Sequence, residues 1–171
     1  MTDIVLSVTT RECIALRGFT QRIELGMLES LEHETWFAQP ALIHAEPLAA
    51  EVRLVTLFQQ ADQVLIDERG HFAADQAVLP EAFAAGSGLA GLKKHVQAKA
   101  RERSGVVGTC ELIGYAFDPV QLPHLFLLVY RCRLAPAVQV AAGAGSWVSV
   151  ATLEHVIEVA HERWFIPAVK R

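Results

Sequence analysis

A run of cationic side chains between residues 88 and 106 is the part of this sequence best suited to chemistry. The segment GLAGLKKHVQAKARERSGV carries a single acid, Glu102, among residues that are basic or become basic on protonation: Lys93, Lys94, His95, Lys99, Arg101 and Arg103. Lysine and arginine bind phosphate and carboxylate anions. Three interpretations stay open for this surface: a solvated face without a ligand, a site that binds an anion directly, or a protein–protein contact.

The spacing of the apolar residues predicts that this segment is one amphipathic helix. They recur at steps of three and four and so share one side of the helix: Leu89, Leu92, Val96 and Ala100. Ser87 suits an N-cap, and Gly105 suits the left-handed residue that ends many helices. Lys99 and Glu102 are three residues apart, so they can form an ion pair on the helix surface.

A mixed sheet is expected to carry this helix. Strands are predicted over 3–9, 52–58, 64–67, 109–117 and 124–134, with a further pair at 138–140 and 147–150. Segments 52–58 and 64–67 form a hairpin in this interpretation. The central strands are apolar on both faces, so both faces must be covered. The expected fold class is α/β, an α/β/α sandwich around a mixed β-sheet.

The rest of the chain is expected to be helices and loops within one domain. Helical patterns cover 21–34 and 151–169, with a helical turn at 11–16, whereas 36–47 and 71–86 are predicted as loops. No linker divides the chain, so we expect a single domain over 1–171. Its parts would be a strand-and-helix extension over 1–47 and a core over 48–171.

Composition narrows the function classes. The chain has 171 residues, of which 52% are hydrophobic, which favours a large core and apolar surface buried in an oligomer such as a homodimer. The formal net charge of −4 argues against general nucleic-acid binding. The longest uncharged run, 134–153, is interrupted by proline and glycine, so we expect no membrane helix.

The cysteines and the N-terminus favour a reducing cytoplasm. Cys13, Cys110 and Cys132 are odd in number and form no CxxC pair, which argues against a cysteine-based zinc site and against a disulfide framework. Cys110 and Cys132 lie in apolar strand-like runs, so we expect them to be small buried hydrophobic residues. No basic region followed by an apolar core opens the chain, so we expect no signal peptide. The histidines form no HxH or HExxH motif, so no metal motif is predicted from them.

The order of segments from 51 to 170 resembles the Nudix hydrolase family. The resemblance rests on a helix ending in RERSGVV, followed by TCELIGY, HLFLLVYRCRL and SWVSVATLEHV. The opening IVLSVTT and LRGFTQ are also similar to the N-terminal segment of Nudix-like bacterial phosphohydrolases. For an active member, the resemblance implies magnesium-dependent hydrolysis of a nucleoside diphosphate derivative.

The sequence departs from the family motif where that chemistry is done. Anchored on Gly105 and Val106, Glu102 matches one metal-binding glutamate, but Lys99 and Arg103 replace two other glutamates. Further positions of the motif are also lost, at Ala84, Ala90 and Ala98. Magnesium takes hard oxygen ligands, usually including carboxylates, and it is the magnesium that activates the attacking water. A face with these cations repels a divalent metal ion.

The resemblance therefore implies a catalytically degenerate Nudix-like protein with a binding or regulatory role toward an anionic, nucleotide-like ligand. No metal or cofactor is expected, and activity as an enzyme is not favoured. The expected ligand contacts are Lys94, His95, Lys99, Arg101, Arg103 and, at the start of a strand, His124.

Two alternatives stay open. The first is a divergent Nudix phosphohydrolase that uses magnesium, with Glu102 joined by Glu111 and Asp118 if these two face the helix. The second is an oligomeric scaffold or interaction protein, which the high apolar content favours.

Overall fold

A computed structural model of the chain describes residues 3–11, 18–21, 33–78, 88–105, 108–140 and 142–171, and for 88–90 it describes the backbone only. The strands are β1 Val5–Thr9, β2 Gly18–Thr20, β3 Thr35–Ala38, β4 Ala49–Gln60, β5 Gln63–Ile66, β6 Ala73–Gln76, β7 Thr109–Asp118, β8 Leu122–Arg133 and β9 Ser146–Ser149. The helices are α2 Pro40–Ala45, α3 Gly88–Ser104, α4 Leu153–Val156, α5 Ala160–Arg163 and α6 Ile166–Val169, with a 3-10 turn, η2, at Val150–Thr152.

The strands form one mixed sheet. Its path runs β2-β7-β8-β4-β1-β3, while β5 and β6 also pair with β4, and β9 pairs with β5. The β4–β8 pair is parallel, from Glu51 opposite Leu125 to Gln59 opposite Arg133, and the other pairs are antiparallel. The predicted mixed sheet is confirmed, as is the hairpin between β4 and β5.

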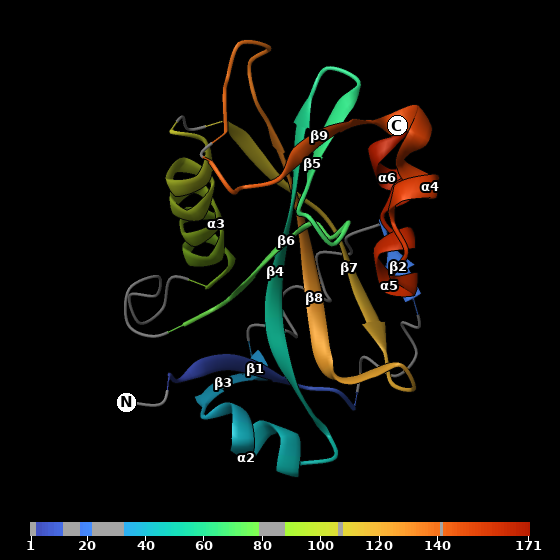
Figure 1. Ribbon diagram of the computed structural model, residues 1–171. Helices are drawn as coiled ribbons and strands as arrows, with labels where there is room; N and C mark the ends of the chain where they lie inside the picture. Colours follow the sequence, from blue (N-terminus) through green and yellow to red (C-terminus); the bar gives the residue numbers. More distant parts are fainter. Residues whose placement is uncertain (1–2, 12–17, 22–32, 79–87, 106–107, 141) are drawn as a thin grey trace.

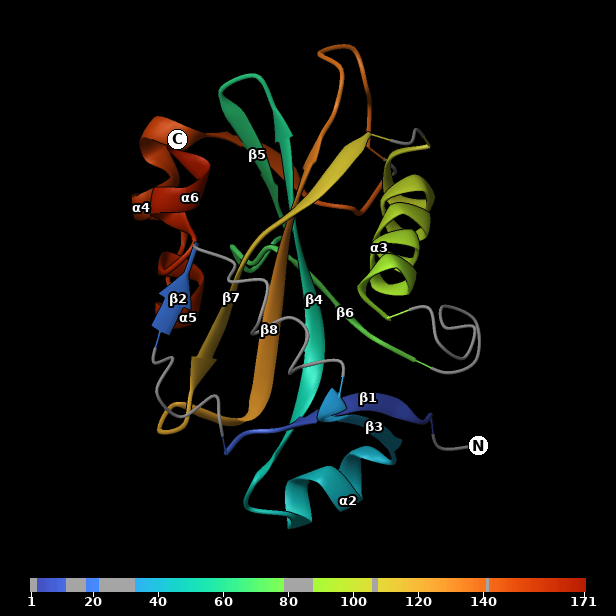
Figure 2. The same cartoon turned by 180° about the vertical axis from the view of Figure 1, so that it is seen from behind.

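The sheet lies between helices on both sides. Figures 1 and 2 show α3 against one face and α4, α5 and α6 against the other. Side chains along β4 point alternately to the two faces of the sheet, so this strand contributes to both hydrophobic cores. Leu54 and Phe58 pack in the core that contains Leu92 and Val96 of α3. Leu57 packs in the core that contains side chains of the C-terminal helices. The predicted α/β/α sandwich is confirmed.

Several predicted boundaries were wrong for local reasons. Segment 36–47 is not a loop, because a four-residue strand there pairs with β1 and Pro40 begins α2. Segment 71–86 contains β6, which is too short to show periodicity. Segment 138–140 is not a strand, since Gln60 Nε2 donates to the carbonyls of Ala135 and Val138, and β9 pairs with β5 instead.

The closing helix is also interrupted. Residues 151–169 form η2, α4, α5 and α6 rather than one helix, because Ile157 and Val159 adopt extended backbone angles. Pro167 lies in the first turn of α6, where its missing N–H costs no helical hydrogen bond. The predicted helical turn at 11–16 and most of the predicted helix at 21–34 lie outside the described residues.

Two glycines hold positions that favour glycine, one through its backbone angle and one through a close approach. Gly105 ends α3 with φ of 69°, and its N–H donates to the Arg101 carbonyl at 2.8 Å, as the sequence predicts. At Gly114 a Cβ atom would lie 2.4 Å from the carbonyl oxygen of Thr20. The close approach of β2 to β7 therefore requires glycine at 114.

A disulfide joins β7 and β8, which contradicts the prediction from the cysteine count. Cys110 and Cys132 are directly opposed in the strand register, their Cα atoms are 4.1 Å apart, and both are buried. Their separation of 22 residues resembles no compact cysteine motif, so only the pairing of two strands brings them together. The cysteines therefore do not favour a reducing compartment. No helix among the described residues is long and apolar enough to cross a membrane.

Candidate functional site

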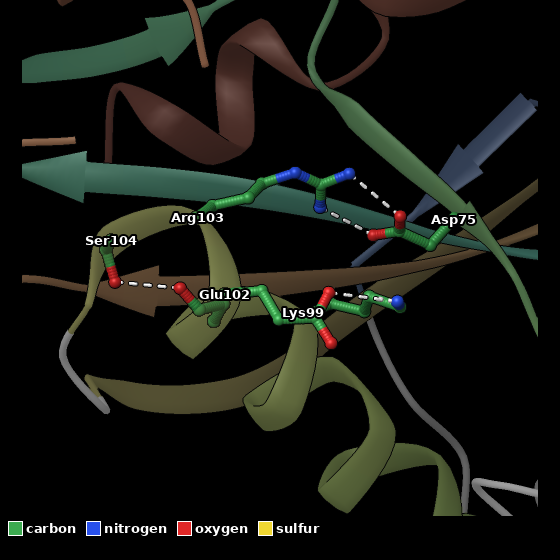
Figure 3. A network of polar contacts seen from close by, with 6 residues as sticks. Asp75, Lys99, Glu102, Arg103 and Ser104 are labelled. Atoms are coloured by element: carbon green, nitrogen blue, oxygen red, sulfur yellow. Dashed lines mark hydrogen bonds and ion pairs between the residues drawn. The ribbon is translucent and has the colours of Figure 1, made fainter. Parts of the chain in front are cut away.

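The C-terminal half of α3 and the strand β6 form the candidate site. His95, Lys99 and Arg103 follow one another at four-residue steps, so they share one side of the helix. Asp75 of β6 faces this side and contacts Arg103, as the close-up in Figure 3 shows. The site therefore combines a strand, β6, and a helix, α3, that do not follow one another directly in the sequence.

Arg103 and Asp75 form a bidentate ion pair that joins α3 to the sheet. The two guanidinium nitrogens lie 2.6 and 2.8 Å from the two carboxylate oxygens. Only 29% of the Arg103 side chain and 15% of the Asp75 side chain is exposed, so water screens the pair weakly. The hydrogen bonds from Arg103 to Asp75 raise the pKa of the arginine above its ordinary value. Arg103 is thus a fixed cation.

Lys99 forms the ion pair that its spacing from Glu102 allows. Lys99 Nζ lies 3.0 Å from Glu102 Oε2, but 63% of the Glu102 side chain is exposed. An exposed pair of this kind contributes little, on the order of 0.5 kcal/mol or less. The ammonium group of Lys99 can therefore exchange this partner for another anion.

Lys94 and Arg101 lie on a different side of the helix. They are seven residues apart, which is two turns, and both are exposed. Neither forms an ion pair with a described residue. The predicted ligand contacts on α3 therefore divide into an inner set of His95, Lys99 and Arg103 and an outer set of Lys94 and Arg101.

His95 lies partly buried in the inner set. Burial is the main cause that lowers its pKa below 6.5, and Lys99 lowers the pKa further, while Asp75 acts in the opposite direction. The lowered pKa favours the neutral imidazole at neutral pH, and a backbone hydrogen bond with Gln76 engages the ring.

We expect His95 to make the fold less stable in mild acid. Below pH 6.5 the unfolded chain takes up a proton that folded His95 resists, so stability present above this pH is lost as the pH falls toward the lower folded pKa. Urea unfolding at pH 7.5 and pH 5 measures the loss, and His95→Gln should reduce it. An identical loss in both proteins would contradict this assignment.

The other predicted site residues lie away from this side of α3. His124, at the start of β8, has its Nδ1 atom 3.4 Å from the carbonyl oxygen of Ala49, and its ring lies 5.3 Å from that of His44. Glu111 contacts Arg131 and Arg133 on the face of the sheet that carries the C-terminal helices. Asp118 ends β7, where its Oδ1 accepts from the N–H groups of Val120 and Gln121. These residues do not gather around Glu102.

The carboxylates near α3 do not fit magnesium. Asp75 is engaged by Arg103 and Glu102 by Lys99, so each carboxylate already has a positive partner. Across the described part of the chain, no three His, Cys, Asp or Glu side chains are grouped to hold a metal ion. A divalent cation placed here would face a lysine and an arginine at close range.

Sequence reasoning missed Asp75. It lies in a segment predicted as a loop, and the sequence AADQAV around it has no recognisable motif. Its partner Arg103 is 28 residues away along the chain, so only the antiparallel pairing of β6 with β4 places the two together. The one available signal was the charge of Arg103, which needs a partner when partly buried.

Comparison with known proteins identifies the fold. No protein-family model matches the sequence, and no curated protein matches it significantly. Among solved structures, "Tm1382, a putative Nudix hydrolase" superimposes with a TM-score of 0.74 at 14% identity, over 97% of each chain. A "putative oxidoreductase" from Sinorhizobium meliloti 1021 gives a TM-score of 0.51 at 12% identity, over 71% of this chain and 38% of that one.

A third structure, the MutT mutator protein of Bacillus halodurans, gives a TM-score of 0.47 at 14% identity over 71% of this chain and 83% of that one. The agreement with the first structure extends over almost the whole of both chains. The chain therefore has a Nudix-like fold.

Proposed function

We propose that this protein binds an anionic, nucleotide-like ligand on the inner side of α3, without a divalent cation and without hydrolysing it. The observation that carries the proposal is the replacement of two motif glutamates by Lys99 and Arg103 on one side of the helix. Basic side chains can neutralise phosphate directly, where the Nudix family uses magnesium.

The contacts assign different tasks to the cations. Arg103 is held by Asp75 and keeps the helix in place. Lys99 is paired with Glu102, whose carboxylate is exposed, so a ligand can replace this partner. Lys99 is therefore the primary phosphate contact, and His95 lies one helical turn before it on the same side of α3. Lys94 and Arg101 lie outside the site and attract anions from a distance.

Calorimetric titration with ADP in the presence of EDTA tests this assignment. Lys99→Gln is expected to weaken binding about tenfold, the effect of losing one charge-assisted hydrogen bond. Lys94→Gln is the matched control, because it removes the same charge from the outer side of the same helix and should change only the salt dependence. Equal losses in both variants, or no binding by the unaltered protein, would contradict the proposal.

The hydrolase alternative is tested with the same ligand. With magnesium present, we expect no cleavage of ADP to AMP and phosphate, and no cleavage of a nucleoside diphosphate sugar to the nucleoside monophosphate and the sugar phosphate. Turnover that disappears on addition of a chelator or in Glu102→Gln would show that the protein is an enzyme after all.

An interaction role is the second candidate, and exposed apolar side chains favour it. Four of the six large hydrophobic side chains exposed in the described residues belong to the first 48 positions: Ile4, Trp36, Leu42 and Leu48. They lie on or beside β1, β3 and α2 at one end of the molecule (Figure 1). A solution mass of twice the 18.7 kDa chain would support a homodimer.

We also propose a cytoplasmic location, and this proposal predicts that Cys110 and Cys132 are reduced in the cell. In a reducing compartment the bond between Cys110 and Cys132 would open, because such bonds persist mainly in oxidising environments. The redox state of this pair in the cell therefore bears directly on the location.

A further inference from the structure

The disulfide between Cys110 and Cys132 lies on the face of the sheet that carries α3. Both cysteines belong to the hydrophobic core that also contains Leu92, Val96 and Ala100, from the apolar side of this helix. α3 lies against β7, and only residues 105–108 separate the end of the helix from the start of that strand. The bond therefore fixes the strand that follows α3 and that supports it.

The two halves of β7 are held differently. Residues 115–117 pair with β8 on one side and with β2 on the other. Residues 109–112 pair with β8 alone among the described residues, and a register shift between Leu112 and Gly114 separates them from the second half. A segment with fewer packed neighbours opens locally at a lower free energy. The disulfide thus joins to β8 the half of β7 that opens more easily.

The bond lies close to the end of the β7–β8 pairing. Cys110 and Cys132 are buried, so a reagent does not reach their sulfur atoms while the strands are paired. The next pair outward is Thr109 with Arg133, which is the last pair of the register, and both residues are exposed. Fraying of this end therefore lets a small thiol or a small disulfide approach the cysteines.

We propose that Cys110 and Cys132 form a redox switch that controls how firmly α3 is held on the sheet, with a low-molecular-weight disulfide such as oxidised glutathione as the oxidant. One protein thiolate attacks the small disulfide, forms a mixed disulfide and releases one small thiolate. The other protein thiolate attacks the protein sulfur of this mixed disulfide and releases the second small thiolate. Two protein thiols become one disulfide, one small disulfide becomes two thiols, and the protons pass to the released thiolates.

The switch acts on the candidate site through the support of the helix. In the oxidised protein β7 cannot leave β8 at Cys110, so the apolar side of α3 keeps the surface on which it packs. In the reduced protein, local opening of residues 109–112 removes part of that surface. Binding on α3 needs the helix in place, so the reduced protein binds the ligand more weakly, a consequence that rests on the proposed function.

Hydrogen exchange of the full-length chain, after equilibration with oxidised or reduced glutathione, tests the switch. A Cys13→Ser background leaves only the pair to contribute thiols, which alkylation and mass spectrometry then count. Reduction is expected to cause a loss of protection at residues 109–112 and 92–104 that exceeds the loss in β1. No loss, an equal loss in β1, or a loss limited to β7 would overturn the proposal. So would a pair that glutathione neither reduces nor oxidises in the folded protein.

The double variant Cys110→Ala/Cys132→Ala is the control for the exchange experiment. It has no bond to open, so exchange in α3 should not respond to glutathione, and a response would overturn the proposal. Calorimetric titration with ADP then compares the oxidised and reduced forms of the unaltered pair. Equal binding by the two forms would overturn the link to the site. Failure of both forms to bind ADP would contradict the proposed function, whereas hydrogen exchange in α3 would still decide the switch.

Discussion

Reduction of the Cys110–Cys132 disulfide is expected to lower the free energy of unfolding by roughly 3 kcal/mol. The bond closes a loop over a separation of 22 residues, and opening it frees that loop in the unfolded chain. Loop-closure entropy for this length gives roughly 3 kcal/mol in the chain-entropy model. Equilibrium unfolding in urea, with the protein fully reduced or fully oxidised, measures the difference.

The double variant Cys110→Ala/Cys132→Ala is the control for this prediction. It lacks the bond, so its unfolding midpoint should not respond to reductant, and it should resemble the reduced protein apart from a small loss of packing. An unaltered chain that unfolds at the same urea concentration with and without reductant would contradict the assigned role. Trapping of free thiols by alkylation in cell extracts reports which state the cell maintains.

Replacement of Asp75 by alanine is expected to destabilise the protein by roughly 2 kcal/mol. The change leaves the Arg103 guanidinium partly buried without its carboxylate, and a buried charge that loses its partner is costly. For a chain of this size the melting temperature should fall by roughly 4–8 °C. Calorimetry of the unaltered protein and the variant gives both quantities.

Arg103→Met and the double variant Asp75→Ala/Arg103→Met complete a thermodynamic cycle. The double variant should be more stable than Asp75→Ala alone, because the methionine leaves no unpaired charge and keeps the packing volume. If Asp75→Ala is neutral, or if the two changes simply add, the ion pair does not hold α3 against β6. The proposed difference between a fixed Arg103 and an exchangeable Lys99 would then fail.

Much of the architecture was predictable because it depends on local patterns. The apolar steps of α3, its stop at Gly105 and the long apolar stretches within β4 and β8 are properties of short segments. A sheet whose central strands are apolar on both faces must be covered twice, so the layers followed as well. The short elements β3, β6 and α2 escaped prediction, since four to six residues show too little periodicity.

By itself the sequence determined that α3 carries several cations and a single acid, because residue identity alone decides the sign of a charge. Only the tertiary structure decided which of those charges are engaged. Pairing of β6 with β4 brings Asp75 to Arg103, and pairing of β7 with β8 joins Cys110 to Cys132 and sets Glu111 against Arg131 on the far face of the sheet. Such contacts follow from strand register, which is fixed by the packing of whole sheet faces rather than by any local stretch of chain.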